Sequence, residues 1–412
     1  MLMIGSIKRF PLIQSGLIHA SNLFTGVIVL ICCVFFFGWK DYGYISLVVS
    51  FSLLSTQVSV LGNPGLMIAL LVKADHIEKN LILNAFLRNI RLPNLLVIIG
   101  ILGILCLRVT MDVIFSLSFP VEMVVGILVY SLFAPFNKMV LSALTLPDTY
   151  KSYMHLLIFK NVLIVLLILL SVSSNSVVLL FLSFSLAELL IFPFVKFLKH
   201  RHFRVKHQLP KTHIDAGIVK QVPVLAVTLY YELLAKFDFY VFAALMSPNT
   251  FGLYALISNV NESIHGYLAS VRTQVTPHFT DKSELPIFSK LERLEVVKLI
   301  LTAQIIVGFV FIAIIYRLRE GDLNFWTTLY ILLTASTLVM IKTLVFGGVY
   351  IQRNQTLVFS RFAILHLFIL SGICFTVAWA LNPISALVAA ILVNLFASRL
   401  LTSNLPIGSK SV

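Results

Sequence analysis

Acidic and basic side chains inside otherwise apolar stretches are the residues of this sequence that could do chemistry. Glu232 and Lys236 lie four residues apart, so a helix would bring the carboxylate and the ammonium group together. Glu262 and His265 lie three residues apart and form a second pair that can titrate, because histidine changes charge near neutral pH. The first pair fits two interpretations, a solvated cavity that handles charge or a buried ion pair that holds its helix.

The elements that carry these pairs are long apolar runs. Hydrophobic residues make up 59% of the 412 residues and charged residues 12%, a composition that a water-soluble fold of this length could not carry. A bilayer core of roughly 30 Å needs about 20 apolar helical residues per crossing, and backbone groups without water must be paired within helices. About twelve runs are long enough, at residues 12–38, 44–72, 92–109, 119–142, 152–172, 177–199, 217–246, 250–278, 296–316, 324–350, 357–381 and 383–402. The sequence therefore predicts an all-α polytopic membrane protein.

Polar residues concentrate on the first, second, seventh and eighth of these spans. They include the amides Asn22, Gln57 and Asn259 as well as the two charged pairs. Each polar group in a span is costly, so its placement is informative. Small polar residues also join helices in membranes. Helix packing is the preferred interpretation of four serines: Ser52, Ser55, Ser59 and Ser270.

Other polar groups have simpler interpretations. Asp238 lies on a different face of its helix from Lys236, and we expect it to cap that helix or to meet Lys160. His366 is expected to be a packing residue. The cysteines lack the spacing of a metal site or a disulfide framework and are expected to be small core residues. They are Cys32, Cys33, Cys106 and Cys374.

The net charge of +14 is distributed unevenly over this topology. If Lys8 and Arg9 start in the cytoplasm, the outer connections hold few basic residues, whereas the inner loop 200–216 is strongly basic. The basic outer residues are Lys40, Arg108, Arg317 and Arg319. This asymmetry follows the positive-inside rule, so both termini are predicted to be cytoplasmic and the positive charge requires no nucleic-acid partner.

The loop 200–216 also divides the chain into an N-terminal bundle, 1–199, and a C-terminal bundle, 217–412, of about six spans each. A shift of 209 residues lays Asp41–Leu47 over Thr250–Leu256. We expect both segments to form tight turns, in which glycine can take the left-handed conformation. Such duplication is typical of transporters, whose substrate is handled between the halves.

Motifs of catalysis are missing from the sequence. It contains no nucleophile elbow, Walker A sequence, zinc-protease motif or glycine-rich dinucleotide turn. No connection exceeds about 20 residues, whereas membrane glycan polymerases usually carry a large outer loop. We therefore expect a protein that is not an enzyme and that holds no cofactor and no metal.

Four segments of the chain resemble polysaccharide flippases of the multidrug/oligosaccharidyl-lipid/polysaccharide (MOP) exporter superfamily, most closely the Wzx-type O-antigen flippases. These segments are Gly38–Leu47, Leu61–Leu66, Phe237–Tyr240 and Ser247–Leu256. The resemblance implies a V-shaped, MATE-like pair of six-helix bundles in the bacterial inner membrane. The implied substrate is an oligosaccharide repeat unit on undecaprenyl pyrophosphate, used in O-antigen and lipopolysaccharide biosynthesis and moved by alternating access.

Roles follow from this resemblance. Lys236 is the first candidate for binding the anionic head group, with Lys160 and Arg272 behind it. The amides of the polar stripes are candidates for binding the glycan: Asn22, Gln57 and Asn259. The candidates for coupling to a proton or a sodium ion are Glu232, Glu262, His265 and Asp238.

Partners implied besides the substrate are membrane lipids, a polysaccharide polymerase and a chain-length regulator. Two alternatives stay open. A cation-coupled multidrug exporter of the same superfamily would favour carboxylates and aromatic rings over cations in its cavity. A membrane glycan polymerase or ligase is the alternative from another class.

The predicted topology can be tested by cysteine labelling. Single cysteines introduced at Asn249 and Asn175 should react with a membrane-impermeant reagent from outside, and one at Arg204 should not. Labelling at position 204 without labelling at 249 would reverse the topology.

Overall fold

We describe the fold from a computed structural model of the chain. It describes residues 18, 21–22, 24–60, 63–111, 120–203, 218–259, 324–336 and 356–403. Within these ranges the chain is helical, with short turns, and seven helical segments are long and apolar enough to cross a membrane. The expectation of an all-α polytopic membrane protein is confirmed.

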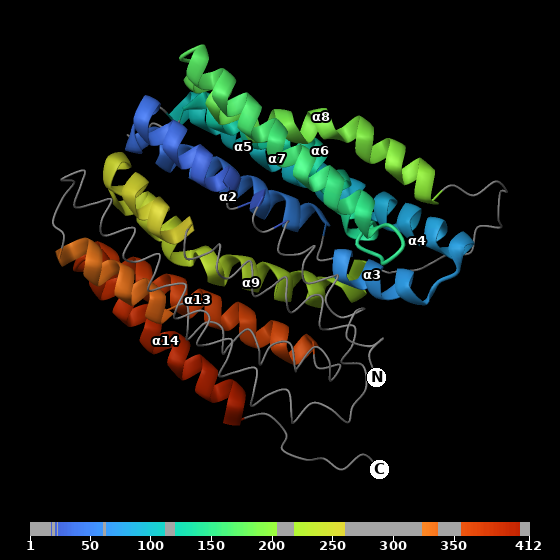
Figure 1. Cartoon of the computed structure of the whole chain (residues 1–412). Coiled ribbons are helices and arrows are strands. Elements are labelled where there is room, and N and C mark those ends of the chain that lie inside the picture. The colour runs from blue at the N-terminus through green and yellow to red at the C-terminus, as the bar shows by residue number, and fades with distance from the viewer. Residues whose placement is uncertain are drawn as a thin grey trace, which may run out of the picture. The chain divides into compact units, whose positions relative to one another are not determined.

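The labelled helices follow one another along the described chain (Figure 1). They are the π-helix η1 (Cys33–Phe37), α2 (Trp39–Val60), α3 (Asn63–Lys73), α4 (His76–Asn89), α5 (Arg91–Met111), α6 (Val121–Ala143), α7 (Tyr150–Ser173), α8 (Val177–Phe203), α9 (Ile218–Leu245), α13 (Thr356–Ala380) and α14 (Pro383–Ser403). Residues 248–259 and 324–336 are also helical.

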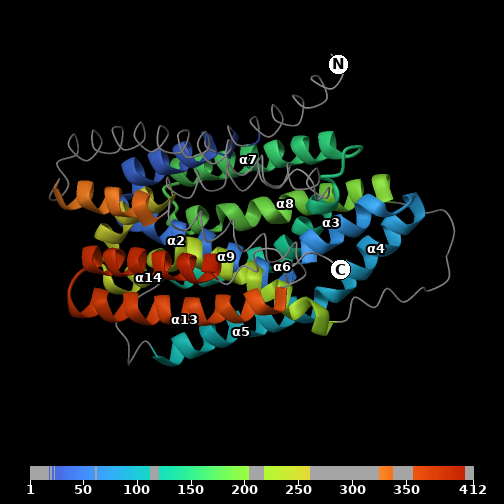
Figure 2. The same cartoon turned by 90° about the horizontal axis from the view of Figure 1, so that it is seen from below.

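Close contacts divide the chain into two compact units. One unit runs from Ala20 to Leu229, and the other combines Met1–His19 with Tyr230–Val412. In the first unit α6 packs against α8, α2 and α5, and α7 packs against α8. In the second unit α13 and α14 lie side by side (Figures 1 and 2).

A glycine allows α6 and α8 to approach closely. A Cβ atom at Gly126 would lie 3.0 Å from the backbone oxygen of Phe181. The hydroxyl of Ser185 donates a 2.6 Å hydrogen bond to the Gly126 carbonyl. Small residues of this kind bring helix backbones together in membranes, where lipid provides no hydrophobic drive for association.

A buried apolar core, here called the end core, lies at one end of this unit. It is built from α2, α3, α4, α6, α7 and α8. Its buried members include Phe86, Leu87, Ile90, Val140 and Val195. Close packing of this kind resists local deformation, so the end core gives the surrounding helix ends fixed positions.

The predicted span 44–72 covers most of α2 and α3, and residues 61–62 between them lie outside the described residues. The connection before residue 92, predicted to be an inner loop, contains α4, a helix that the sequence did not predict.

The predicted tight turns at Asp41–Leu47 and Thr250–Leu256 are also wrong. The first segment lies inside α2, and the second lies in the helix 248–259. The left-handed backbone is at Gly38 instead, with φ +98°, directly before α2. The repeated segments therefore share a different position, the opening turns of a helix.

Candidate functional site

A buried ion pair joins α7 and α8. The ammonium group of Lys160 donates to one carboxylate oxygen of Glu188, and the side chains are 17% and 4% exposed. The amide of Asn137, on α6, donates 2.8 Å to the other carboxylate oxygen and 2.9 Å to the Glu188 backbone oxygen. One carboxylate thus ties three helices together.

This arrangement gives Lys160 a partner that the sequence analysis missed. The contact of Lys160 with Asp238 stays a prediction, because the two residues belong to different units. Glu188 could have been identified from the sequence, because it is an acidic residue in the middle of the apolar run 177–199. A carboxylate there requires a cation or hydrogen-bond donors.

The serines of α2 connect it to its neighbours. The Ser55 and Ser131 hydroxyls are 2.7 Å apart, linking α2 to α6. The Ser59 hydroxyl donates 3.0 Å to the amide oxygen of Asn94 on α5. The packing role predicted for Ser55 and Ser59 is confirmed, whereas the buried Ser52 hydroxyl has no partner among the described residues.

Two of the predicted glycan-binding amides lie in this unit. Asn22 is exposed, and its side-chain oxygen accepts a 2.7 Å hydrogen bond from Asn161, the residue after Lys160. Gln57 is half-buried on α2. Binding of substrate by either residue stays a prediction.

Lys236 and Asp238 are both buried in the second half of α9, with 6% and 5% exposed. The Lys236 ammonium group lies 5.4 Å from the centre of the Phe239 ring, within the range of a cation–π interaction. Asp238 accepts a hydrogen bond from the Tyr254 hydroxyl. The acid thus joins α9 to the helix 248–259.

Aromatic packing holds this connection. Ring centres of Phe242 and Tyr254 are 4.7 Å apart, and those of Phe239 and Phe251 are 5.0 Å apart, both edge to face. The Ser247 hydroxyl accepts a 3.3 Å hydrogen bond from the Thr250 backbone amide, as a helix-capping serine does. The segment that resembled the flippases therefore folds back onto α9.

His366 on α13 is buried, as expected of a packing residue, but it is also part of a polar contact. Its Nδ1 atom lies 2.8 Å from the Tyr230 hydroxyl of α9, while Nε2 is buried with no partner among the described residues. Tyr230 could not be predicted as its partner from the sequence, because the two residues lie far apart along the chain.

The remaining candidates have less structural description. Glu262, His265 and Arg272 lie outside the described residues. Glu232 lies in α9, but its side chain is also outside the described part, so its pairing with Lys236 stays a prediction. Asn259 is half-buried and is the last described residue of the helical segment 248–259.

Comparisons with known proteins place the fold. No protein-family model matches the sequence, and no curated protein sequence matches it. A solved chain called "protein A" aligns with a TM-score of 0.70 and 14% identity over 96% of this chain and 94% of that one. The MATE multidrug transporter DinF-BH, solved as a complex, aligns with a TM-score of 0.65 and 15% identity over 96% and 94%.

An inward-facing MATE transporter of the MOP superfamily aligns with a TM-score of 0.57 and 13% identity over 94% of this chain and 91% of that one. The protein therefore has the fold of MATE transporters of this superfamily. The MATE-like fold expected from the resemblance of the four sequence segments is confirmed. Membership of the MOP superfamily and the Wzx-type subtype stay predictions.

The Lys160–Glu188 pair generates a stability prediction. Lys160→Met should leave a buried carboxylate without its cation and lower the stability of the purified protein by about 3–5 kcal/mol. Thermal unfolding in detergent measures the change. The double variant Lys160→Met/Glu188→Gln should recover most of the loss, because no charge then remains buried.

Lys151→Met is the matched control, since Lys151 is an exposed lysine at the start of the same helix. Its stability should stay near that of the wild type. Equal unfolding temperatures for Lys160→Met and Lys151→Met would contradict the structural role of the pair.

Proposed function

We propose that this protein is a flippase that moves an undecaprenyl-pyrophosphate-linked oligosaccharide repeat unit across the bacterial inner membrane. The fold and the multi-pass topology support transport as the class of function. The two predicted bundles, 1–199 and 217–412, would alternate in opening toward each side of the membrane. The glycan and pyrophosphate would follow a polar path, while the prenyl chain stays in lipid.

Lys236 is the observation that carries this proposal. A lysine in a membrane helix is costly, by roughly 2.5–3.5 kcal/mol at the centre of a span on insertion scales. Lys236 is 6% exposed in a helix of a transporter fold, with an aromatic ring beside its charge. A pyrophosphate is the chemical complement of such a cation.

The two buried carboxylates among the described residues have partners within the protein, which supports an anionic substrate as well. Glu188 is neutralised by Lys160, and Asp238 accepts a hydrogen bond from Tyr254. In this proposal Arg272 adds a second cation, and Asn22, Gln57 and Asn259 contact the glycan. In this proposal three acidic residues and one histidine couple transport to a proton or sodium gradient. They are Glu232, Glu262, Asp238 and His265.

Multidrug export is the second candidate, because DinF-BH, a multidrug transporter, shares the fold across nearly the whole chain. The two functions differ in the charge that the site must hold. A cationic drug requires a free carboxylate, whereas a lipid pyrophosphate requires a cation. The same set of variants can therefore discriminate between them.

The function is tested by replacing Lys236 in the host. Lys236→Ala should abolish surface polysaccharide at near-normal protein abundance, because the head group loses its cation, and Lys236→Arg should retain part of it. The completed single-repeat lipid-linked oligosaccharide should collect in the inner leaflet, where periplasmic enzymes that attack outward-facing sugars cannot reach it.

Lys160→Met provides the contrast, since it should lower abundance and polysaccharide together. Single repeats at the surface of the Lys236→Ala strain would point to a polymerase defect and refute the flippase assignment. Normal polysaccharide with new drug sensitivity would establish the multidrug exporter. A Lys236→Ala protein that loses abundance in proportion to polysaccharide would make Lys236 structural.

A further inference from the structure

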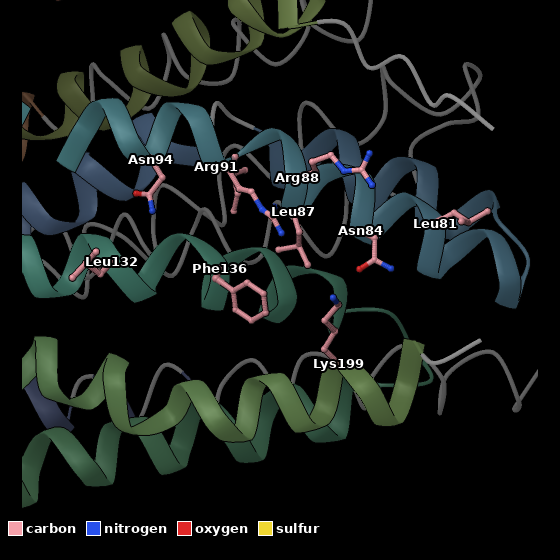
Figure 3. A pocket seen from close by; sticks show the side chains of 10 residues that line it. Leu81, Asn84, Leu87, Arg88, Arg91, Asn94, Leu132, Phe136 and Lys199 are labelled. Atoms are coloured by element: carbon pink, nitrogen blue, oxygen red, sulfur yellow. The ribbon is translucent and has the colours of Figure 1, made fainter. Parts of the chain in front are cut away.

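A cavity of about 500 Å³ lies between α4, α5, α6 and α8 (Figure 3). All of its lining residues belong to the Ala20–Leu229 unit, so its geometry is internal to that unit. The function proposed above does not involve this cavity. The lining residues are Leu81, Asn84, Leu87, Arg88, Ile90, Arg91, Asn94, Leu132, Phe136 and Lys199.

Three basic residues line this cavity, and no acidic residue does. Arg88 comes from α4, Arg91 from α5 and Lys199 from α8. Arg91 and Lys199 act on each other as like charges. Among the described residues, none forms a salt bridge with any of the three. Like charges held together without an acid are typical of a site for an anion.

Two amides add neutral donors to the cations. The Asn94 oxygen accepts from Ser59, at 3.0 Å, so the amide hydrogens of Asn94 are left for another acceptor. Asn84 donates one hydrogen bond to Asn80, at 2.7 Å, and an amide nitrogen carries two hydrogens. In Figure 3 Asn84, Arg91 and Lys199 point into the space between the helices.

The rest of the lining is apolar and firmly supported. Leu87 and Ile90 belong to the end core, and Phe136 packs against it. Leu132 is 47% exposed, and the neighbouring Leu95 of α5 is 52% exposed. In a membrane protein such exposed leucines face lipid chains. The cavity thus joins a basic end to a surface that faces lipid.

We propose that this cavity binds the phosphate group of a membrane lipid at the cytoplasmic face of the N-terminal unit. Arg88, Arg91 and Lys199 hold the phosphate, because guanidinium groups form paired hydrogen bonds to phosphate oxygens and lysine adds a point charge. The lipid chain lies along Leu132 and Phe136. The positive-inside distribution predicts that these basic residues face the inner leaflet.

Phosphate esters on lipids have two sources in such a membrane, a phospholipid and a polyprenyl pyrophosphate. Both offer an anionic phosphate beside an apolar chain, which is the chemistry that the cavity complements. Free inorganic phosphate lacks the chain, so the apolar wall would contribute nothing to its binding.

Binding to the purified full-length protein in detergent tests the proposal by native mass spectrometry. The probes are phosphatidylglycerol, undecaprenyl pyrophosphate, diacylglycerol and inorganic pyrophosphate. Both phosphate-bearing lipids should bind, and the tighter one identifies the source. Diacylglycerol and inorganic pyrophosphate should bind at least tenfold more weakly, because each lacks half of the recognised chemistry.

The double variant Arg88→Gln/Arg91→Gln should lose at least tenfold in affinity for both lipids. The matched control is Lys151→Gln/Arg201→Gln, which removes the same charge from two exposed residues outside the cavity. Thermal unfolding of both proteins checks that they are folded. Leu132→Trp, which fills the cavity and keeps every charge, should also weaken binding.

Equal affinity in the cavity variant and the surface control would overturn the proposal, as would diacylglycerol binding as tightly as phosphatidylglycerol. Inorganic pyrophosphate that binds as tightly as the lipids would overturn the lipid part. Because lipid binding is measured without transport, this outcome is independent of whether the protein is a flippase.

Discussion

A polar side chain inside a bilayer has no water to bind, so it must find its partner within the protein. The described part of this structure is arranged around that constraint. Glu188 is satisfied by Lys160 and Asn137, which fixes α6, α7 and α8 to one another. Asp238 is satisfied by Tyr254, which fixes α9 to the helix that follows it. The same groups that would be costly in lipid therefore hold the helices of each unit together.

This constraint separates two lysines that look alike in the sequence. The charge of Lys160 neutralises a buried carboxylate, and binding of the head group by Lys160 stays a prediction. Lys236 is buried beside the ring of Phe239, where a substrate anion would complement it in the proposed function. Alternating access needs units that move as rigid bodies, and the contacts of Glu188 would keep its unit rigid. In the proposed function Lys236 would supply the charge that binds the substrate. The basic cavity beside the end core adds a place where lipid can contact one unit alone.

The separation of interacting residues along the sequence decides which features could be predicted from the sequence. Membrane spans can be predicted from local hydropathy, so the bounds of the predicted runs 177–199 and 383–402 agree closely with those of α8 and α14. The pairing of Lys160 with Glu188 joins residues 28 positions apart and depends on which faces of α7 and α8 meet. The cavity collects Arg88 and Lys199 from distant segments, so only the folded chain reveals it.

Movement of a lipid pyrophosphate between leaflets, the proposed function, is tested by reconstitution. Purified protein would be placed in vesicles containing a fluorescent oligosaccharide on a polyprenyl pyrophosphate, with an ion gradient imposed. A membrane-impermeant quencher added outside then reports how much of the inner-leaflet probe has reached the outer leaflet. We expect the wild type and Lys160→Met/Glu188→Gln to expose the inner pool, and Lys236→Ala not to expose it. Folded wild-type protein that leaves the inner pool protected while it transports a cationic drug would show that the protein is not a flippase of this kind.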